Sequence, residues 1–140
     1  MVCLHSMNNK DELKWVLRFI IPLPPITKKN SSQIVKFGNR SALIPSKQYK
    51  KFETDCKFYC TPYNIDYPIN IECLYYMPTR RKVDITNLLS ATHDILTKHN
   101  VIADDNMDIV VSVDGSRVFY DKENPRTEIT ISRTERTFIK

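Results

Sequence analysis

The sequence predicts a single α+β (mixed α/β) domain in which two helices pack on one mixed sheet, in the order β-α-β-α-β-β. Three observations lead to this prediction. Strand-like and helix-like segments alternate along the chain without an internal repeat. The chain has 140 residues, which is enough for one hydrophobic core and too few for two. Its composition, 41% apolar and 26% charged, is that of an ordinary globular protein.

The domain is expected to span residues 1–140, with loose tails at 1–12 and 133–140. A first strand is predicted over residues 13–23, where Trp15, Leu17 and Phe19 alternate with other side chains until prolines end the pattern. Residues 27–46 are expected to form a long polar loop. Loops of this length are often functional, so the cations of this segment either follow a phosphate backbone or are simply solvated.

The remaining elements follow in order. A helix is predicted over residues 46–60, because Ser46 favours a helix start and Tyr49, Phe52 and Cys56 form an apolar stripe. Its lysine-rich outer face is either solvated or in contact with DNA. A linker at 61–67 leads to a strand at 68–76. Strands at 108–120 and 126–132 complete the sheet, and Asp114 with the glycine after it favours a bulge or a turn.

The stretch 80–105 carries the functional signal. A basic triplet, Arg80, Arg81 and Lys82, precedes a helix that is predicted from Asp84 to about His99. When successive residues are placed ~100° apart, the apolar ones fall within roughly 20–140° and the polar ones at roughly 240–340°. The face expected to be buried consists of Ile85, Leu88, Leu89, Thr92, Ile95, Leu96 and His99, and the polar face consists of Asn87, Ser90, Ala91, Asp94 and Lys98.

Several classes of protein are excluded or disfavoured by composition. Two glycines are too few for a glycine-rich phosphate loop. The four cysteines include no Cys-x-x-Cys pair, so a zinc ribbon is not expected, and Cys56 and Cys60 are expected to pack as small hydrophobic residues. No signal peptide or membrane span is found, so an intracellular, reducing compartment fits best. The net charge of +5 is compatible with nucleic acid.

Asp84 has two interpretations. A carboxylate at a helix start caps free N–H groups and suits the helix dipole, so Asp84 could be no more than a cap. Three cations immediately before it, and the acidic pair Asp104–Asp105 immediately after the helix, favour a functional role instead.

This stretch resembles the RusA family of Holliday-junction resolvases of bacteria and their phages. The resemblance covers roughly residues 15–132, and its specificity lies in the order and spacing of its pieces. It implies a small homodimer that uses acidic residues and a divalent metal to nick DNA strands at four-way junctions. The matching residues are Met77, Pro78, Arg80, Arg81, Asp84, Ile85, Asn87, Leu88, Asp94, Leu96, Thr97, Lys98, Asp104 and Asp105, with Pro24, Pro25 and Asn30 after the first strand.

Two positions depart from the pattern of the best-known members, which carry Asp-x-Asp-Asn at the helix start and a Lys one turn later. Here Thr86 stands in place of the second acid and Ser90 in place of the Lys. The two changes remove one negative and one positive charge, so the local sum is unchanged.

From these observations we predict the residues of the site. Asp84, Asp104 and Asp105 are the catalytic candidates, and the same three with Asp114 are the candidate ligands of Mg²⁺, or of Mn²⁺. Asp94 is expected to be structural. Arg80, Arg81, Lys82, Lys28, Lys29, Asn87 and Arg117 are the candidate DNA contacts, and the alternative for the cations is that they form surface ion pairs worth at most ~1 kcal/mol each.

The predicted function is that of a metal-dependent, structure-selective endonuclease that acts on four-way junctions in DNA recombination and repair. We expect the enzyme to be a homodimer, to be located in the cytoplasm and to have no membrane partner. The alternative is a non-catalytic protein that binds branched DNA and descends from such an enzyme. Thr86 and Ser90 favour that alternative. A small protein-interaction domain is the third hypothesis.

Overall fold

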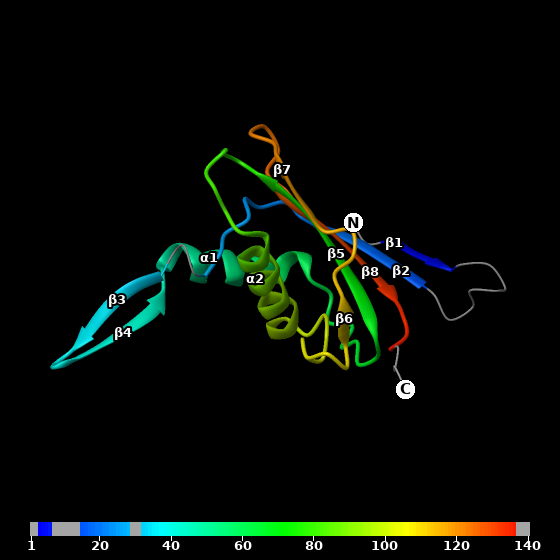
Figure 1. Ribbon diagram of the computed structural model, residues 1–140, viewed down its shortest axis with the longest axis horizontal. Helices are drawn as coiled ribbons and strands as arrows, with labels where there is room; N and C mark the ends of the chain where they lie inside the picture. The colour runs from blue at the N-terminus through cyan, green and yellow to red at the C-terminus, as the bar shows by residue number, and fades with distance from the viewer. Residues whose placement is uncertain (1–2, 7–14, 29–31, 137–140) are drawn as a thin grey trace.

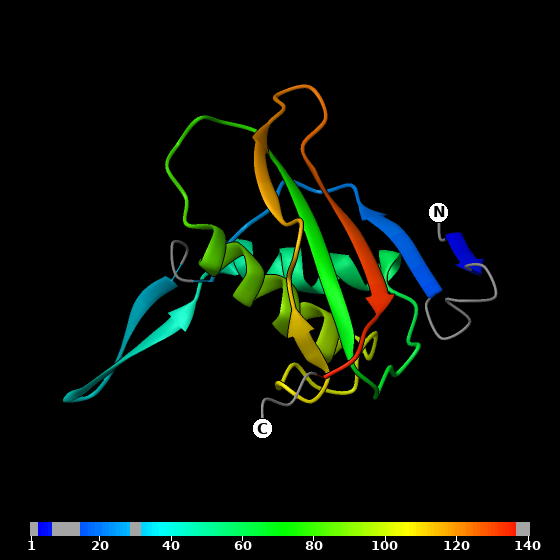
Figure 2. The same cartoon turned by 45° about the vertical axis from the view of Figure 1, so that its right-hand side comes forward.

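The computed structural model describes residues 3–6, 15–28 and 32–136 of the chain. They form a mixed six-stranded sheet, two helices, and a separate two-stranded hairpin that projects from the body (Figure 1). Both helices lie on the same face of the sheet, as Figure 2 shows with the sheet in front of them. The predicted α+β class, with two helices packed on one mixed sheet, is confirmed.

The sheet is organised around β5, which runs from Ile69 to Met77. It pairs antiparallel with β8 along one side. Along its other side it pairs parallel with β6 near its start and with β7 near its end. The path through the sheet is β1-β2-β8-β5-β6, and the other strands are β1 (Cys3–Ser6), β2 (Trp15–Ile21), β6 (Val110–Ser112), β7 (Arg117–Tyr120) and β8 (Arg126–Arg133).

The hydrophobic core lies between this sheet and the helices. Side chains of β5 alternate, so that Ile69, Ile71, Cys73 and Tyr75 are buried while their neighbours on the strand are partly exposed. The same alternation occurs in β2 and β8. The opposite face of the sheet carries no helix, and the residues of β5 that alternate with the buried ones, such as Glu72 and Tyr76, lie on it.

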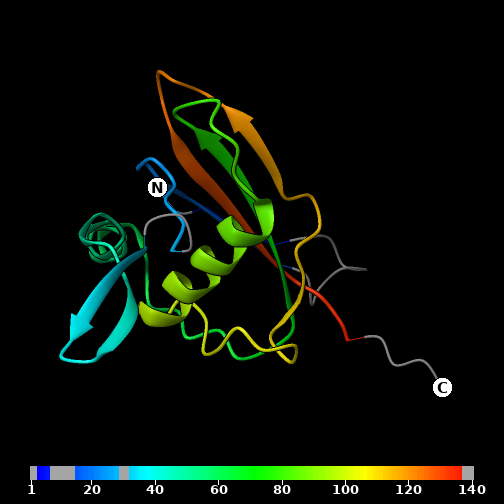
Figure 3. The ribbon, with the colours of Figure 1, turned by 60° about the vertical axis from the view of Figure 1, so that its left-hand side comes forward.

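Helix α2, Ile85–Lys98, returns from the end of β5 toward its start and leads on to the parallel strand β6 (Figure 3). The hydroxyl groups of Tyr75 and Thr92 hydrogen-bond at 2.7 Å inside the core and tie this helix to β5. Ala91 is buried although it was predicted on the polar face. Asp94 and Lys98 of that face form ion pairs with Lys28 and with the α1 residue Glu53, so α1 and the segment that follows β2 lie next to this side of α2.

Helix α1, Lys47–Asp55, starts as predicted. The side chain of Ser46 accepts a hydrogen bond from the backbone N–H of Tyr49 at 3.1 Å. The helix ends earlier than expected and continues as a 3₁₀ turn, Cys56–Tyr59. Burial raises the pKa of the Cys56 thiol to about 12 and that of Cys60 to about 11, so both are neutral packing groups, as predicted.

The prediction of a long polar loop over residues 27–46 is wrong for residues 32–45. Strands β3 (Ser32–Phe37) and β4 (Arg40–Pro45) pair as an antiparallel hairpin. Gly38 at its tip has a positive φ of 60°. The Ile34 and Phe37 side chains of the hairpin are 71% and 63% exposed.

Three smaller differences concern the ends and the last strands. The strand predicted over residues 108–120 is divided into β6 and β7 by a turn at Asp114 and Gly115, where Gly115 has a φ of 88°. In the segment expected to be a loose tail, β1 pairs with β2. Near the other end, Arg136 forms an ion pair with Asp108. Among the residues that the structure describes, no helix is long and apolar enough to cross a bilayer.

Candidate active site

Asp84 occupies the N-cap position of α2 but does not use its carboxylate as a cap. Its backbone is extended, and its carbonyl oxygen accepts the first helical N–H groups, from Asn87 and Leu88, at 3.1 and 3.2 Å. The side chain accepts no hydrogen bond from these N–H groups, and the Asn87 amide contacts it at 3.4 Å. The exposed carboxylate therefore stays available beside the positive end of the helix.

The basic triplet lies on the connection between β5 and α2, and its members have different neighbours. The Arg80 guanidinium lies 5.0 Å from the centre of the Tyr120 ring of β7. Arg81 and Lys82 line an open cleft on the other side, between this connection, α1 and the segment that follows β2. All three cations are exposed. Two predicted DNA contacts thus lie at the cleft, and one lies at the edge of the sheet.

Asp104 and Asp105 lie in a turn that the chain itself stabilises. The Asp104 carboxylate accepts a hydrogen bond from the backbone N–H of Asp105 at 2.8 Å and another from the Asn106 amide at 3.0 Å. These contacts, the backbone one first, lower the pKa of Asp104 below its ordinary value. The Asp104 carboxyl is therefore ionised at neutral pH, as a metal ligand must be.

The acidic turn and Asp84 lie at opposite ends of α2. Ala103, just before the turn, donates its N–H to the carbonyl of Ile65 at 2.8 Å, which fixes the turn near the start of β5. Asp84 follows the end of β5 and precedes the 14 residues of α2, a length of ~21 Å. Among the described residues no three His, Cys, Asp or Glu side chains form a group that could hold a metal ion.

Asp114, the fourth candidate ligand, also lies away from the helix start. It therefore does not lie beside Asp84 and does not take the place of the acid missing at Thr86. Its backbone N–H donates to the Asn70 side chain at 2.8 Å, and its carbonyl accepts from the same side chain at 3.2 Å. Asn70 belongs to the first part of β5, on the face without helices. The four candidate ligands Asp84, Asp104, Asp105 and Asp114 therefore do not form one group within the described part of a single chain.

The other predicted residues have separate positions. Lys28 forms an ion pair with Asp94 at 3.6 Å and lies 5.9 Å from the Tyr49 ring centre, which gives Asp94 the structural role expected of it. Lys29 lies outside the described residues. The His99 ring shares a hydrogen bond of 2.7 Å with the carbonyl of Glu53, so His99 is satisfied as expected, although it is only half-buried.

Helix α2 itself contains His93, and burial lowers the pKa of this side chain. The Asp105 and Asp94 carboxylates act in the opposite direction and raise it.

Sequence reasoning did not identify a stack of aromatic and basic side chains on the open face of the sheet. Tyr76 of β5 and Phe119 of β7 stack with ring centres 4.9 Å apart. Arg126 lies 3.7 Å from the centre of the Tyr76 ring, and Arg117 lies 5.8 Å from that of Phe119. The alternation of β5 places Tyr76 on the face opposite Tyr75, but the pairing of β5 with β7 was needed to bring Phe119 to it.

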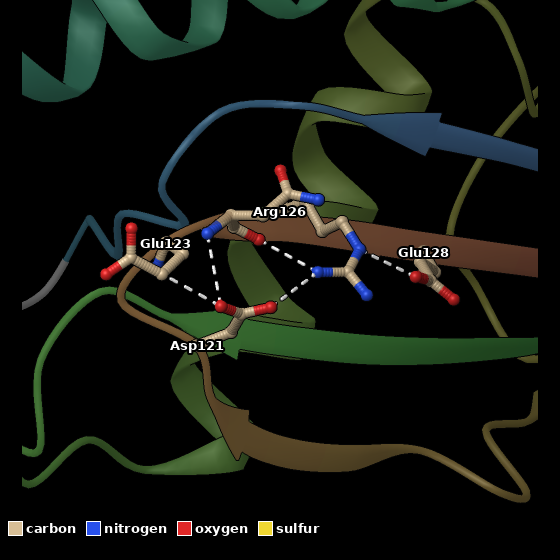
Figure 4. A network of polar contacts seen from close by, with 5 residues as sticks. Asp121, Glu123, Arg126 and Glu128 are labelled. Carbon is tan, nitrogen blue, oxygen red and sulfur yellow. Dashed lines mark hydrogen bonds and ion pairs between the residues drawn. The ribbon is translucent and has the colours of Figure 1, made fainter.

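Arg126 anchors this stack through a polar network at the turn between β7 and β8 (Figure 4). Its guanidinium donates to Asp121 at 3.0 Å and to Glu128 at 2.7 Å. The Asp121 carboxylate also accepts the backbone N–H groups of Asn124 and Glu123. The Asn124 N–H contributes most to lowering the pKa of Asp121, followed by Arg126.

The network predicts a dependence of stability on pH. Because the pKa of Asp121 is lower in the folded state than in the unfolded state, its contribution is complete above the unfolded value of ~3.9 and is lost as the pH falls through the folded value. We expect Asp121→Asn to destabilise the protein at pH 7 and to have a smaller effect near pH 2. Urea denaturation at both pH values measures this, with exposed Asp66→Asn as control. An equal effect of Asp121→Asn at both pH values would contradict it.

Comparison with known proteins agrees with the resemblance. The model of the family described as Endodeoxyribonuclease RusA matches residues 22–132. A relative from Aquifex aeolicus (strain VF5), "Crossover junction endodeoxyribonuclease RusA", is 42% identical over 43 residues. This match covers 31% of the present chain and 34% of the relative, so only about a third of the relative's length is matched. Because the family model covers most of the chain, the protein belongs to the RusA endodeoxyribonuclease family.

Proposed function

We propose that this protein is a divalent-metal-dependent endodeoxyribonuclease that nicks four-way DNA junctions during recombination and repair. The observation that carries the proposal is the start of α2, where an exposed carboxylate that is not used for capping lies within four residues of three exposed cations. Membership of the RusA family, and the crossover-junction activity in the name of the Aquifex relative, support the same reaction.

The residues at this helix start have complementary tasks in such a reaction. A DNA phosphate is repelled by Asp84, and the basic triplet offsets that repulsion. Arg80 and Arg81 can each hold a phosphate through two parallel hydrogen bonds. The helix N-terminus adds backbone N–H groups and a partial positive charge. The Asn87 amide, next to the Asp84 carboxylate, can orient a phosphate oxygen or the attacking water.

The proposed metal is Mg²⁺, with Mn²⁺ as the alternative, because the candidate ligands are carboxylate oxygens. A complete set of three protein ligands does not fit within the described part of one chain. Mg²⁺ is commonly held by only one or two carboxylates together with waters and substrate phosphates. The remaining ligands are then expected to be waters, DNA phosphates or acids from a second copy of the chain.

A second candidate function has observations in its favour. Thr86 and Ser90 are both exposed on the first turns of α2, at the positions where better-known relatives carry an acid and a Lys. Together with the incomplete ligand set, they favour a protein that binds branched DNA without cutting it. The cleavage assay below distinguishes the two functions.

Replacement of the acids tests the nuclease. We expect Asp84→Asn and Asp105→Asn to lower nicking of four-way DNA in Mg²⁺ by on the order of 100-fold, the scale of losing one electrostatic contact to a transition state. Binding of the junction should persist because the phosphate contacts remain. Asp104→Asn and Asp114→Asn, assayed in Mg²⁺ and Mn²⁺, identify which other acid takes part.

The control for this experiment is Asp66→Asn, which removes an exposed carboxylate from the linker before β5 and should cut normally. If the wild type binds junctions and cuts none with either metal, the non-catalytic function is correct. Normal nicking by both Asp84→Asn and Asp105→Asn would disprove the assignment of the acids.

Replacement of the arginines tests the DNA contacts. The double change Arg80→Ala with Arg81→Ala should weaken DNA binding and reduce the slope of log affinity against log salt by up to about 2, since each phosphate contact contributes ~0.9. Fluorescence anisotropy over a series of salt concentrations measures the slope. The control Arg18→Ala removes an exposed arginine from β2 and should leave the slope unchanged. An unchanged slope in the double variant would mean that Arg80 and Arg81 are structural.

We also propose that the protein works as a two-fold homodimer. Two nicks related by near two-fold symmetry require two sites in the same relation. A second chain would also supply another copy of the acidic turn, which within one chain is separated from Asp84 by the length of α2. The dimer thus offers one source for the ligands that a single chain does not bring together.

Light scattering should give a homodimer at micromolar concentration. If one site uses acids from both chains, unfolding and refolding inactive Asp84→Asn together with inactive Asp105→Asn should restore roughly a quarter of the wild-type sites, because half of randomly paired dimers are mixed and each holds one intact site. Each variant refolded alone is the control. A stable monomer, with or without junction DNA, would contradict the dimer, and a mixture without activity would contradict the shared site.

A further inference from the structure

The cleft beside the basic triplet is large enough for a ligand and has walls from three elements. It has a volume of about 500 Å³ and opens between the segment after β2, helix α1 and the connection from β5 to α2. Ligand pockets in proteins commonly have volumes of about 300–1,000 Å³. Val83, the residue directly before Asp84, is one of the lining residues. The cleft is therefore one residue away along the chain from the carboxylate at the helix start.

The walls and the mouth of the cleft differ in character. Pro24, Pro25, Phe52 and Val83 provide apolar and aromatic surface. Cations stand at the rim, where Arg81 and Lys82 are both exposed. Lys51 also lines the cleft and is paired with Asp55 at 2.7 Å, which leaves an excess of two positive charges among these four residues. An apolar interior with a cationic rim matches a molecule that has a flat apolar part and an anionic part.

We propose that this cleft binds one unpaired nucleotide of the branched DNA, with its base against the apolar walls and its phosphate at Arg81 and Lys82. The inference rests on the proposed function, since it assumes that the basic triplet binds DNA. A base can stack on apolar and aromatic surface whatever its identity, because every base has a π-face. Taking a base out of a duplex costs a few kcal/mol, and the cost is lowest where pairing is already disturbed, as at the point where strands exchange.

The cleft would give the protein a way to recognise a branch that does not depend on reading sequence. In uninterrupted duplex DNA every base is paired and stacked, so occupation of the cleft is disfavoured there. At a branch point the stacking is interrupted, so a base leaves its pair at lower cost, and its phosphate would lie beside the proposed backbone contacts Arg81 and Lys82. Because Val83 of the cleft directly precedes Asp84, the bound nucleotide would also limit which phosphate approaches that carboxylate.

The test uses four-way junctions that carry 2-aminopurine, a base whose fluorescence rises when it leaves the stack, at each nucleotide next to the branch point in turn. Wild-type protein should raise the fluorescence at one position for each chain, so a two-fold dimer should raise it at two positions related by its axis. Gln48→Trp fills the cleft from α1 and Thr79→Trp fills it from the opposite connection, and both positions are exposed. Each should abolish the rise and weaken junction binding by between about 5-fold and 100-fold, the equivalent of 1–3 kcal/mol for one stacked base.

Two controls separate this binding from general effects on the fold or on DNA affinity. Thr54→Trp places the same side chain on α1 outside the cleft and should behave as wild type. All three variants should bind uninterrupted duplex DNA as wild type does. An abasic nucleotide at the responding position should weaken junction binding by wild type and should have no further effect on Gln48→Trp.

The outcomes distinguish failure of this inference from failure of the proposed function. If wild type binds and nicks junctions but the fluorescence changes at no position, or if both filled variants bind junctions normally, the inference is wrong and the nuclease stands. If wild type binds no junction, both the inference and the proposed function are wrong.

A competition experiment tests the assignment to branched DNA. A free deoxynucleoside monophosphate should compete only at millimolar concentration or above, and micromolar binding without DNA would overturn the assignment to branched DNA.

Discussion

The pairing of β5 on both sides is the constraint on which the rest of the structure depends. Its buried side chains pack against α2, and the Tyr75–Thr92 hydrogen bond fixes that helix to it. A parallel strand next to β5 requires a crossover, and the crossover must start beyond one end of β5 and finish before the other. The basic triplet and Asp84 therefore follow the end of β5, and the acidic turn lies near its start.

This geometry explains why the predicted elements were largely correct and the predicted ion site was not. The alternation in β2, β5 and β8 and the apolar stripe of α2 are local patterns that burial imposes, so they are visible in the sequence. The predicted grouping of Asp84 with Asp105 rested on the family resemblance and required the chain to fold back after the helix. In the structure the acidic turn instead stays near the start of β5, at the other end of α2, whose 14 residues span ~21 Å.

The hairpin β3–β4 was missed for a related reason. Strands are recognised by alternation between a buried and an exposed face, and this hairpin projects from the body with Ile34 and Phe37 both largely exposed. The available signal was Gly38–Asn39, a pair typical of tight two-residue turns, between two stretches that contain β-branched residues. Its position within a polar segment made a loop the simpler interpretation.

The cations around the helix start are held to different degrees, and this affects how DNA can lie on the protein. Lys28 is engaged by Asp94 and the Tyr49 ring, and Arg80 lies over Tyr120 of β7. Arg81 and Lys82 line the cleft. The triplet thus spans from the β7 edge to the cleft, and a DNA backbone that met all three cations would follow the same path. An aromatic ring beneath Arg80 also restricts its side chain before DNA arrives, which reduces the entropy lost on binding.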